Sequence, residues 1–172
     1  MPFIQFTGLS GAGKSTLANQ VKKALTQKGH QVEVIDGDVF RQTLCKDLGF
    51  SKEDRHENIR RLSFVASLLS NHGIIVIVAA INPYDKVREE MREKYQAKTV
   101  WINCELETLQ ERDTKGLYRR AALPEGHPEK LHNLTGIGDT YEIPPNPDLI
   151  IHSHLENIEE SSQKLINFIL NL

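Results

Sequence analysis

Short apolar segments recur along the chain, and longer stretches of mixed polarity separate each from the next. Segments rich in Val, Ile and Phe are typical of buried strands, whereas apolar residues three and four positions apart are typical of helices. Strands that alternate with helices predict a parallel sheet with right-handed crossovers. The segments expected to form strands are Phe3–Phe6, Gln31–Ile35, Ile74–Ala80, Thr99–Asn103 and Asp148–Ile151.

The stretches between these segments carry helical patterns. In the longest one, Ile59 and Leu62 belong to an apolar face, and Ser51 stands where an N-cap is expected. Asn157 and Glu160 have the spacing of a capping box at the start of the final helix. Asp85–Tyr95 is charged and is expected to be a largely exposed helix. Two further helices are expected over Val39–Cys45 and Leu106–Arg112, and three more are expected to begin directly after Gly13, Ser51 and Asn157.

Residues 113–147 interrupt this regularity. Five of the seven prolines and four of the eleven glycines lie between Gly116 and Pro147, and no period is sustained there. A long irregular segment inside a compact domain is often a functional lid. We therefore expect a single domain over residues 1–172 with a lid over about residues 113–147. A cationic cluster around Gly116 supports this reading: Arg112, Lys115, Arg119 and Arg120.

Residues 8–16 read GLSGAGKST and fit the phosphate-binding loop pattern G-x-x-x-x-G-K-[ST] at every fixed position. The loop joins a predicted strand to a helix, so backbone N–H groups and the helix dipole can face phosphate oxygens. Lys14 is expected to reach the β- and γ-phosphates, and Ser15 to ligate Mg²⁺. These features predict a three-layer α/β/α P-loop NTPase fold with a mainly parallel five-stranded sheet. The expected nucleotide-binding residues are Gly8, Leu9, Ser10, Gly11, Ala12, Gly13, Lys14, Ser15 and Thr16.

Two aspartates follow the second predicted strand, at an edge where ligands bind in parallel sheets. One of Asp36 and Asp38 can hold metal-bound water while the other orients an acceptor hydroxyl, and an ordinary Asp-Gly turn is the alternative. Arg41, Arg55 and Asn58 can converge on an anionic acceptor, since arginine binds phosphate or sulfate through a planar fork. Arg60 and Arg61 are read instead as solvated helix charges. Phe50 can stack on a planar ring.

Composition narrows the class of partner. The 172 residues include 21 Lys plus Arg against 23 Asp plus Glu, so the net charge of −2 favours neither nucleic acid nor a membrane as partner. Cys45 and Cys104 form no C-x-x-C pair and are expected to be reduced thiols. The longest apolar run, Ile74 to Ile81, is too short to span a bilayer. We expect a soluble, cytoplasmic protein.

Seven motifs occur in a fixed order between residues 8 and 144, and the resemblance that rests on them covers nearly the whole chain. They are residues 8–16 (GLSGAGKST), 36–41 (DGDVFR), 47–51 (DLGFS), 54–61 (DRHENIRR), 112–118 (RDTKGLY), 134–137 (LTGI) and 141–144 (YEIP). In this set the chain resembles the adenylylsulfate kinases, which transfer the γ-phosphate of ATP to the 3′-hydroxyl of adenosine 5′-phosphosulfate (APS). The resemblance implies ATP and Mg²⁺ as cofactors, APS as the partner, a homodimer, and functional coupling to ATP sulfurylase.

The resemblance also assigns roles to single residues. Lys14, Asp38 and Lys115 would be catalytic, with Asp38 beside the acceptor hydroxyl, and Arg112 would close over the bound ATP. Ser15 would ligate Mg²⁺, and Asp36 would do so through water. The residues implied to bind the acceptor are Asp38, Arg41, Phe50, Arg55, Asn58, Ile81, Asn82, Lys115 and Leu134.

The chain departs from the family pattern at two positions. The family stacks the acceptor adenine between two phenylalanines; Phe50 matches the first, but Leu134 replaces the second. Many members have serine where Asn82 stands, and asparagine cannot be a phosphoacceptor, so the expected reaction is direct in-line transfer. The alternatives are another small-molecule P-loop kinase or an inactive nucleotide-binding paralogue. A regulatory GTP-binding switch would carry an N-K-x-D motif, and the sequence contains none.

Overall fold

The fold is an α/β/α sandwich built on a five-stranded parallel sheet in the order β2-β3-β1-β4-β5. The computed structural model describes residues 1–172. The predicted fold class is confirmed, and each predicted strand lies within one residue of an observed one. The strands are β1 (Phe3–Thr7), β2 (Val32–Asp36), β3 (Ile75–Ala79), β4 (Lys98–Asn103) and β5 (Leu149–His152).

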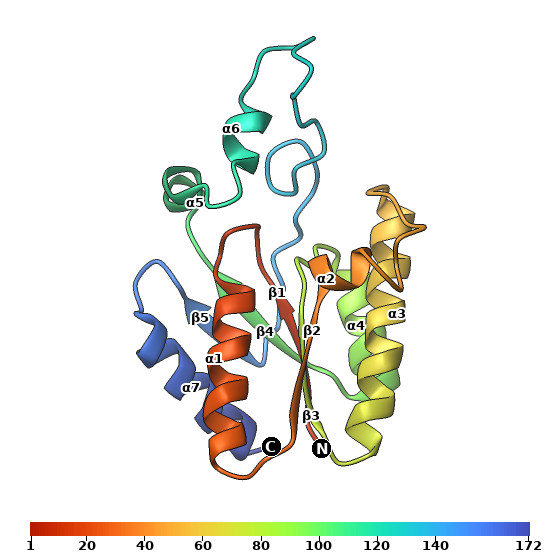
Figure 1. Ribbon diagram of the computed structural model, residues 1–172, viewed down its shortest axis with the longest axis vertical. Helices are drawn as coiled ribbons and strands as arrows, with labels where there is room; N and C mark the ends of the chain where they lie inside the picture. The colour runs from red at the N-terminus through yellow and green to blue at the C-terminus, as the bar shows by residue number, and fades with distance from the viewer.

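Helices cover both faces of the sheet. Figure 1 shows α1 and α7 on one face and α3 and α4 on the other. The short helices α2, α5 and α6 lie toward the edge where the strands end (Figure 1). The helices are α1 (Lys14–Gln27), α2 (Gly37–Arg41), α3 (Lys52–Asn71), α4 (Asp85–Tyr95), α5 (Leu106–Arg112), α6 (Leu117–Ala121) and α7 (Ile158–Leu170).

Two hydrophobic cores fill the spaces between the layers. Phe6 of β1 belongs to the core under α1 and α7, whereas Phe3 belongs to the core under α3 and α4. This split follows from the alternation of side chains along a strand. All five residues of β3 are buried, because helices cover both of its faces. This burial on both faces explains the unbroken apolar run from Ile74 to Ile81.

The predicted caps are confirmed. Ser51 Oγ accepts a hydrogen bond from the Asp54 N–H at 3.1 Å, at the start of α3. At the start of α7, Asn157 and Glu160 form the capping box, each side chain accepting from the other residue's N–H at 2.9 Å. Such caps satisfy N–H groups that have no partner inside the helix.

Two short helices differ from the sequence prediction. The expected Val39–Cys45 helix instead spans Gly37–Arg41. It begins earlier because Asp36 Oδ1 accepts hydrogen bonds from the N–H groups of Asp38 (2.9 Å) and Val39 (3.4 Å). A cap fixes the first helical turn at that point. Within the segment expected to be irregular, α6 forms where the Asp113 carboxylate accepts from the N–H groups of Tyr118 and Arg119, both at 3.0 Å.

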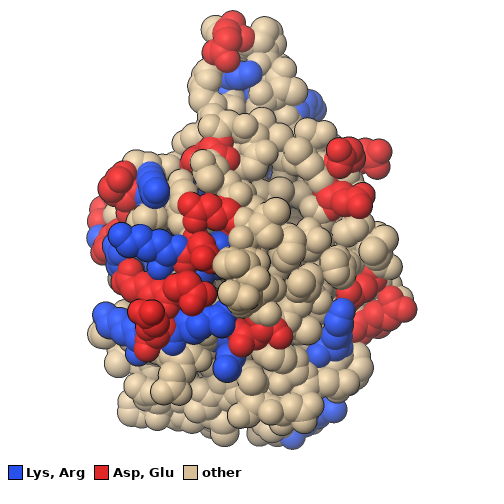
Figure 2. All heavy atoms as spheres, turned by 180° about the vertical axis from the view of Figure 1, so that it is seen from behind, with Lys and Arg blue, Asp and Glu red and all other residues tan.

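Helix α4 is more buried than its charged sequence predicts. Arg88 is fully buried, and Val87 and Met91 are 1% exposed. The outer surface of α4 still carries many charges. Figure 2, a view from behind that of Figure 1, shows acidic and basic side chains intermingled on one flank of the molecule. On α4, Glu90 pairs with Arg60 at 2.7 Å and Arg92 pairs with Glu89 at 3.4 Å. No helix combines the length and the apolar character required to cross a bilayer.

Candidate active site

The phosphate-binding loop leads straight from β1 into α1. Gly13 precedes the helix with φ 93°, a left-handed conformation that strains a residue with a side chain. Helix α1 has no side-chain N-cap, so its first N–H groups are available to an anion. The loop is also held from outside, because the Tyr118 hydroxyl of α6 donates to the Ser10 carbonyl at 2.8 Å. Burial raises the pKa of Tyr118 to about 12, which keeps this hydroxyl a donor.

Lys14, the first residue of α1, is buried against the loop. Its Nζ donates hydrogen bonds to the carbonyls of Gly8 (2.9 Å) and Leu9 (2.7 Å). Burial, followed by the nearby positive charge of Lys115, lowers the pKa of Lys14 to about 8. A negatively charged ligand beside the ammonium would offset both effects, so this lysine is poised to bind an anion.

Ser15 and Asp36 bring two oxygen ligands together beside the loop. The Ser15 hydroxyl donates to Asp36 Oδ2 at 2.5 Å, across the gap between α1 and the end of β2. Hydroxyl and carboxylate oxygens are the ligands that Mg²⁺ prefers in proteins. The pair therefore fits a magnesium ion, with Asp36 also serving as the cap of α2.

A cavity of about 520 Å³ opens between this edge of the sheet and residues 113–147. Across it, the Lys115 ammonium forms an ion pair with Asp38 Oδ2, and both side chains are more than half exposed. The cavity thus joins the phosphate loop to the first predicted acceptor residues. The predicted residues that line it are Ser10, Gly13, Lys14, Ser15, Thr16, Asp36, Asp38, Phe50, Arg55, Ile81, Lys115 and Leu134.

A smaller cavity of about 70 Å³ adjoins the first and receives three more predicted residues, Arg41, Asn58 and Asn82. The two cavities share lining residues, including Phe50 and Arg55. The Asn58 side chain is buried, and its Oδ1 has no hydrogen-bond partner. A buried acceptor without a partner is costly unless a ligand supplies the donor.

Phe50 presents an exposed aromatic face at the junction of the cavities. Its side chain is 54% exposed. The guanidinium carbons of Arg41 and Arg55 lie 4.4 Å and 5.6 Å from the centre of its ring. Cation–π contacts of this kind orient the ring while leaving the rest of its surface open to a ligand. The arrangement suits a planar, anionic molecule.

Arg55 is bound within the protein to a greater degree than the sequence predicts. Its guanidinium donates to the Phe50 carbonyl (3.0 Å), Thr135 Oγ1 (3.0 Å) and the Asn133 carbonyl (2.9 Å). It also pairs with the Asp139 carboxylate at 3.1 Å. Arg55 therefore ties α3 to residues 133–139 while still lining both cavities.

The two departures from the family pattern occupy different settings. Leu134 is 5% exposed and belongs both to the cavity wall and to the hydrophobic core. Asn82 adopts φ 45°, a conformation that asparagine tolerates better than most residues. Its Nδ2 donates to Gln5 Oε1 at 3.0 Å, in the protein interior. Asn82 thus shapes the floor of the smaller cavity.

Arg112 does not line either cavity. Its guanidinium donates to the Ser153 carbonyl at 3.3 Å and lies 3.8 Å from Cys104 Sγ. Gly8, Leu9, Gly11 and Ala12 also stand outside the cavity lining. Arg60 and Arg61 pair with surface acids away from the site, as expected of solvated charges.

Several lining residues were not assigned to the site from the sequence. Asn133 and Thr135 flank Leu134, so the motif at 134–137 was the signal for them. Arg120 appeared only as a member of the cationic cluster. Gly136 permits the close approach of this segment to the phosphate loop, since a Cβ there would lie 2.7 Å from Leu9 Cδ2. The unassigned lining residues are Ala79, Ala80, Leu117, Arg120, Leu131, Asn133 and Thr135.

Comparison with known proteins supports one family. Residues 2–152 match the family model described as adenylylsulphate kinase. The chain is 48% identical over 167 residues to the adenylyl-sulfate kinase of Halothermothrix orenii, covering 96% of this chain and 88% of that one. It is 47% identical over 170 residues to the adenylyl-sulfate kinase of Microcystis aeruginosa, covering 98% and 91%.

Solved structures agree with this assignment. The structure of the Mycobacterium tuberculosis APS kinase CysC in complex with AMPPNP and APS has a TM-score of 0.90 and 38% identity, covering 98% of this chain and 97% of that one. A gluconokinase from Sinorhizobium meliloti, with a TM-score of 0.66, 17% identity and coverage of 99% and 92%, shares the fold alone. The family match, the full-length relatives and the cavity beside the phosphate loop lead to one conclusion: the chain belongs to the adenylylsulphate kinase family.

Proposed function

We propose that this protein transfers the γ-phosphate of ATP to the 3′-hydroxyl of APS, giving 3′-phosphoadenosine 5′-phosphosulfate and ADP in sulfate assimilation. One observation carries the proposal: a single cavity joins the phosphate loop to Asp38, Phe50 and Lys115. A phosphoryl donor and a planar acceptor can therefore meet in one enclosure. The APS kinase solved with AMPPNP and APS, 38% identical to this chain, supports the same pairing of ligands.

The donor half binds and orients the triphosphate. The loop N–H groups hold its oxygens, and Lys14 exchanges its bonds to the Gly8 and Leu9 carbonyls for the β- and γ-phosphates. Ser15 and Asp36 would hold Mg²⁺, which when bound neutralises charge on the phosphate oxygens. These residues fix the γ-phosphate for attack in line with the leaving oxygen.

The acceptor half presents the 3′-hydroxyl. Phe50 stacks on the adenine, while Arg41 and Asn58 bind polar groups of APS from the smaller cavity. The 3′-oxygen of APS attacks the γ-phosphorus while Asp38 accepts the proton of the 3′-hydroxyl. The bond between the γ-phosphorus and the ADP oxygen breaks in the same step. Lys115, already paired with Asp38, supplies positive charge to the transferring group. Asn82 has no nucleophilic hydroxyl, so the transfer is direct.

Residues 113–147 serve as a lid over the two ligands in this scheme. Two contacts support this role: the ion pair between Lys115 and Asp38, and the hydrogen bond from the Tyr118 hydroxyl to the Ser10 carbonyl of the phosphate loop. Water exclusion beneath them favours transfer to the hydroxyl rather than hydrolysis. We further propose that Arg112, whose guanidinium donates to the Ser153 carbonyl, closes over the bound ATP from outside the cavity.

Assembly and cellular setting follow from family membership as further proposals. We propose a cytoplasmic homodimer that receives APS from ATP sulfurylase. A related APS kinase from Thiobacillus denitrificans, 30% identical with a TM-score of 0.71, is described as hexameric, and this chain covers 28% of that one. Light scattering coupled to size-exclusion chromatography distinguishes the expected dimer from a monomer or a hexamer.

The decisive experiment offers the protein Mg-ATP with APS, AMP or gluconate in separate reactions and identifies the phosphorylated product by chromatography and mass spectrometry. We expect product with APS alone. Product with AMP or gluconate but not with APS would instead support another small-molecule kinase, and binding without product would support an inactive paralogue. A phosphoenzyme trapped from radiolabelled ATP would contradict direct transfer.

A further inference from the structure

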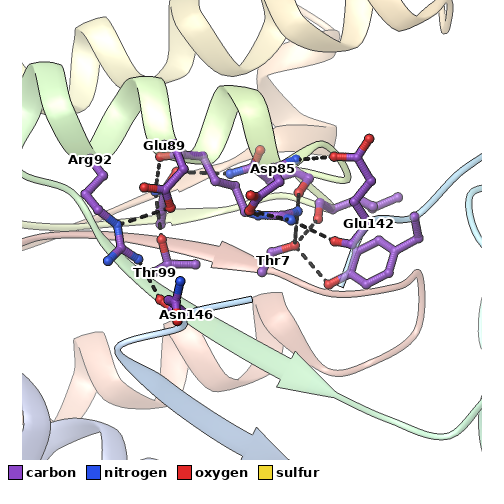
Figure 3. A network of polar contacts seen from close by, with 12 residues as sticks. Thr7, Asp85, Glu89, Arg92, Thr99, Glu142 and Asn146 are labelled. Atoms are coloured by element: carbon purple, nitrogen blue, oxygen red, sulfur yellow. Dashed lines mark hydrogen bonds and ion pairs between the residues drawn. The ribbon is translucent and has the colours of Figure 1, made fainter. Parts of the chain in front are cut away.

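A fully buried guanidinium lies behind the cavity wall. Arg88, the fourth residue of α4, has no exposed surface. A buried charge is expensive and requires partners for its donors. The neighbouring polar groups gather where β1 ends and α4 begins: Figure 3 shows Thr7, Asp85 and Glu142 facing one another there. None of these groups was assigned a role in the reaction above.

Arg88 binds three parts of the chain that are distant in sequence. Its Nη1 donates to the Asn82 carbonyl at 2.8 Å and lies 3.4 Å from Thr7 Oγ1. Its Nη2 donates to the Glu142 carbonyl at 2.7 Å and to Asp85 Oδ1 at 3.1 Å. The two terminal nitrogens of the planar Arg88 guanidinium therefore set the spacing between residue 82 and residue 142.

Further bonds reinforce the same junction. Thr7 Oγ1 lies 2.9 Å from both the Asn82 carbonyl and the Tyr141 hydroxyl. The Glu142 N–H donates to the Pro83 carbonyl at 2.9 Å, and Glu142 Oε2 accepts from the Asp85 N–H at 2.6 Å. The end of the 113–147 segment is thus fastened to the loop that follows β3.

That loop forms part of the acceptor site. Ile81 lines both cavities, and Asn82 and Pro83 line the smaller one beside Asp38, Arg41 and Asn58. The donor residues Lys14 and Ser15 form no hydrogen bond with Arg88. The loop after β3 is linked to the phosphate loop by the Gly8 N–H, which donates to the Ile81 carbonyl at 3.1 Å. Thr7, directly before the phosphate loop, also donates to the Ile81 carbonyl at 3.0 Å.

We propose that Arg88 is a positioning residue for the acceptor half of the site. Through the Asn82 and Glu142 carbonyls it fixes the Ile81–Pro83 loop relative to the end of the 113–147 segment, and so holds APS against Asp38. This inference rests on the proposed function. A displacement of about 1 Å at such a wall can reduce turnover by up to about 100-fold.

Arg88→Lys tests the proposal, and Arg92→Lys is its matched control. Lysine keeps the positive charge but cannot bind both carbonyls through a planar fork. Arg92, one turn later on α4, binds the Asn146 carbonyl at 2.9 Å and the Asp148 carboxylate at 3.2 Å without touching the Ile81–Pro83 loop. It therefore undergoes the same chemical change near the same end of the 113–147 segment.

We expect Arg88→Lys to lower kcat/KM for APS about tenfold, with the Kd for AMPPNP within about twofold of wild type. Arg92→Lys should leave both values close to wild type. Equal losses in the two variants, or an equal loss of AMPPNP affinity and APS turnover, would overturn the proposal. Absence of APS turnover by the wild type would instead refute the proposed function.

Tyr141→Phe provides a second test that does not alter charge. It removes the hydroxyl that meets Thr7 Oγ1 and keeps the ring packed. We expect a loss of about threefold in kcat/KM for APS with unchanged AMPPNP affinity. If Arg88→Lys fails to fold by circular dichroism, wild-type APS kinetics in Tyr141→Phe would overturn the proposal.

Discussion

The donor and acceptor halves of the site are built in different ways. The donor half comes from one continuous loop, residues 8–16, and from Asp36 at the end of β2. Besides Lys14 and Ser15, the groups that this loop offers to a phosphate are backbone N–H groups at the start of α1. The acceptor half gathers side chains from α2, α3, the loop after β3 and residues 113–147. Local glycine-rich geometry defines the first half, whereas contacts between distant segments define the second.

This difference predicts how each half responds to mutation. A donor residue acts through its own charge, so its loss should abolish chemistry without disturbing its neighbours. Acceptor residues such as Arg55 also hold the protein together, so their loss should alter several contacts at once. Mutations that affect one ligand and spare the other are therefore the most informative.

Lys14→Ala should have the largest effect and breaks the donor half alone. Loss of the buried ammonium that we propose binds the β- and γ-phosphates should reduce kcat/KM about 1000-fold. The midpoint of thermal unfolding should stay the same or rise, since a buried charge is removed. Steady-state kinetics and differential scanning fluorimetry measure the two effects. A large fall in the unfolding midpoint would contradict a purely electrostatic role.

Asp38→Ala tests the point where the halves meet. Removing the proton acceptor should lower kcat about 100-fold while AMPPNP binding is retained. Single-turnover kinetics with APS and calorimetry with AMPPNP separate the two properties. Asp38→Asn keeps the shape but not the basicity, and should be impaired to a similar degree. Wild-type turnover by either variant would remove Asp38 from the chemical step.

Phe50→Ala sharpens the acceptor half. Loss of the exposed ring should raise the KM for APS about tenfold, the scale of a base-stacking contact, with little change in AMPPNP affinity. Phe50→Tyr preserves the aromatic face and serves as the control. An unchanged KM in Phe50→Ala would show that the adenine of APS binds elsewhere.

The smallest expected effect is a pH dependence of donor binding. Because the pKa of Lys14 is about 8 in the free protein, this lysine loses its charge as the pH rises through that value. Bound phosphates favour the ammonium, so binding above about pH 8 should take up a proton and weaken severalfold by about pH 9. Calorimetry of AMPPNP binding in buffers of different ionisation enthalpy measures this uptake, which Lys14→Arg should lack.

The parts of the molecule that depend on short-range patterns were predictable from the sequence. The strands, the phosphate loop and the α7 capping box all follow from residues close together in the chain. Short-range patterns did not bring Asp38 and Lys115 together, because the two residues are 77 positions apart. The family resemblance alone assigned both to one catalytic site. Their contact depends on the path of the whole 113–147 segment.

The errors arise from individual side-chain hydrogen bonds that composition and periodicity do not reveal; these bonds are local at α2 and α6 and long-range at Arg88. Asp36 moved the start of α2, and Asp113 formed α6 in a segment whose composition indicated no helix. A charge pattern indicated exposure for α4, yet Arg88 is buried because backbone carbonyls from two loops surround it.

The buried amide pair of Asn82 and Gln5 has an evolutionary consequence. Asn82 Nδ2 donates to Gln5 Oε1, while Gln5 Nε2 is occupied by the Arg88 carbonyl and Thr99 Oγ1. A serine at position 82 is too short to replace that donor and would leave the Gln5 oxygen buried and unpaired. Lineages that exchange asparagine for serine at position 82 should therefore also change position 5, so the two sites are expected to covary across the family.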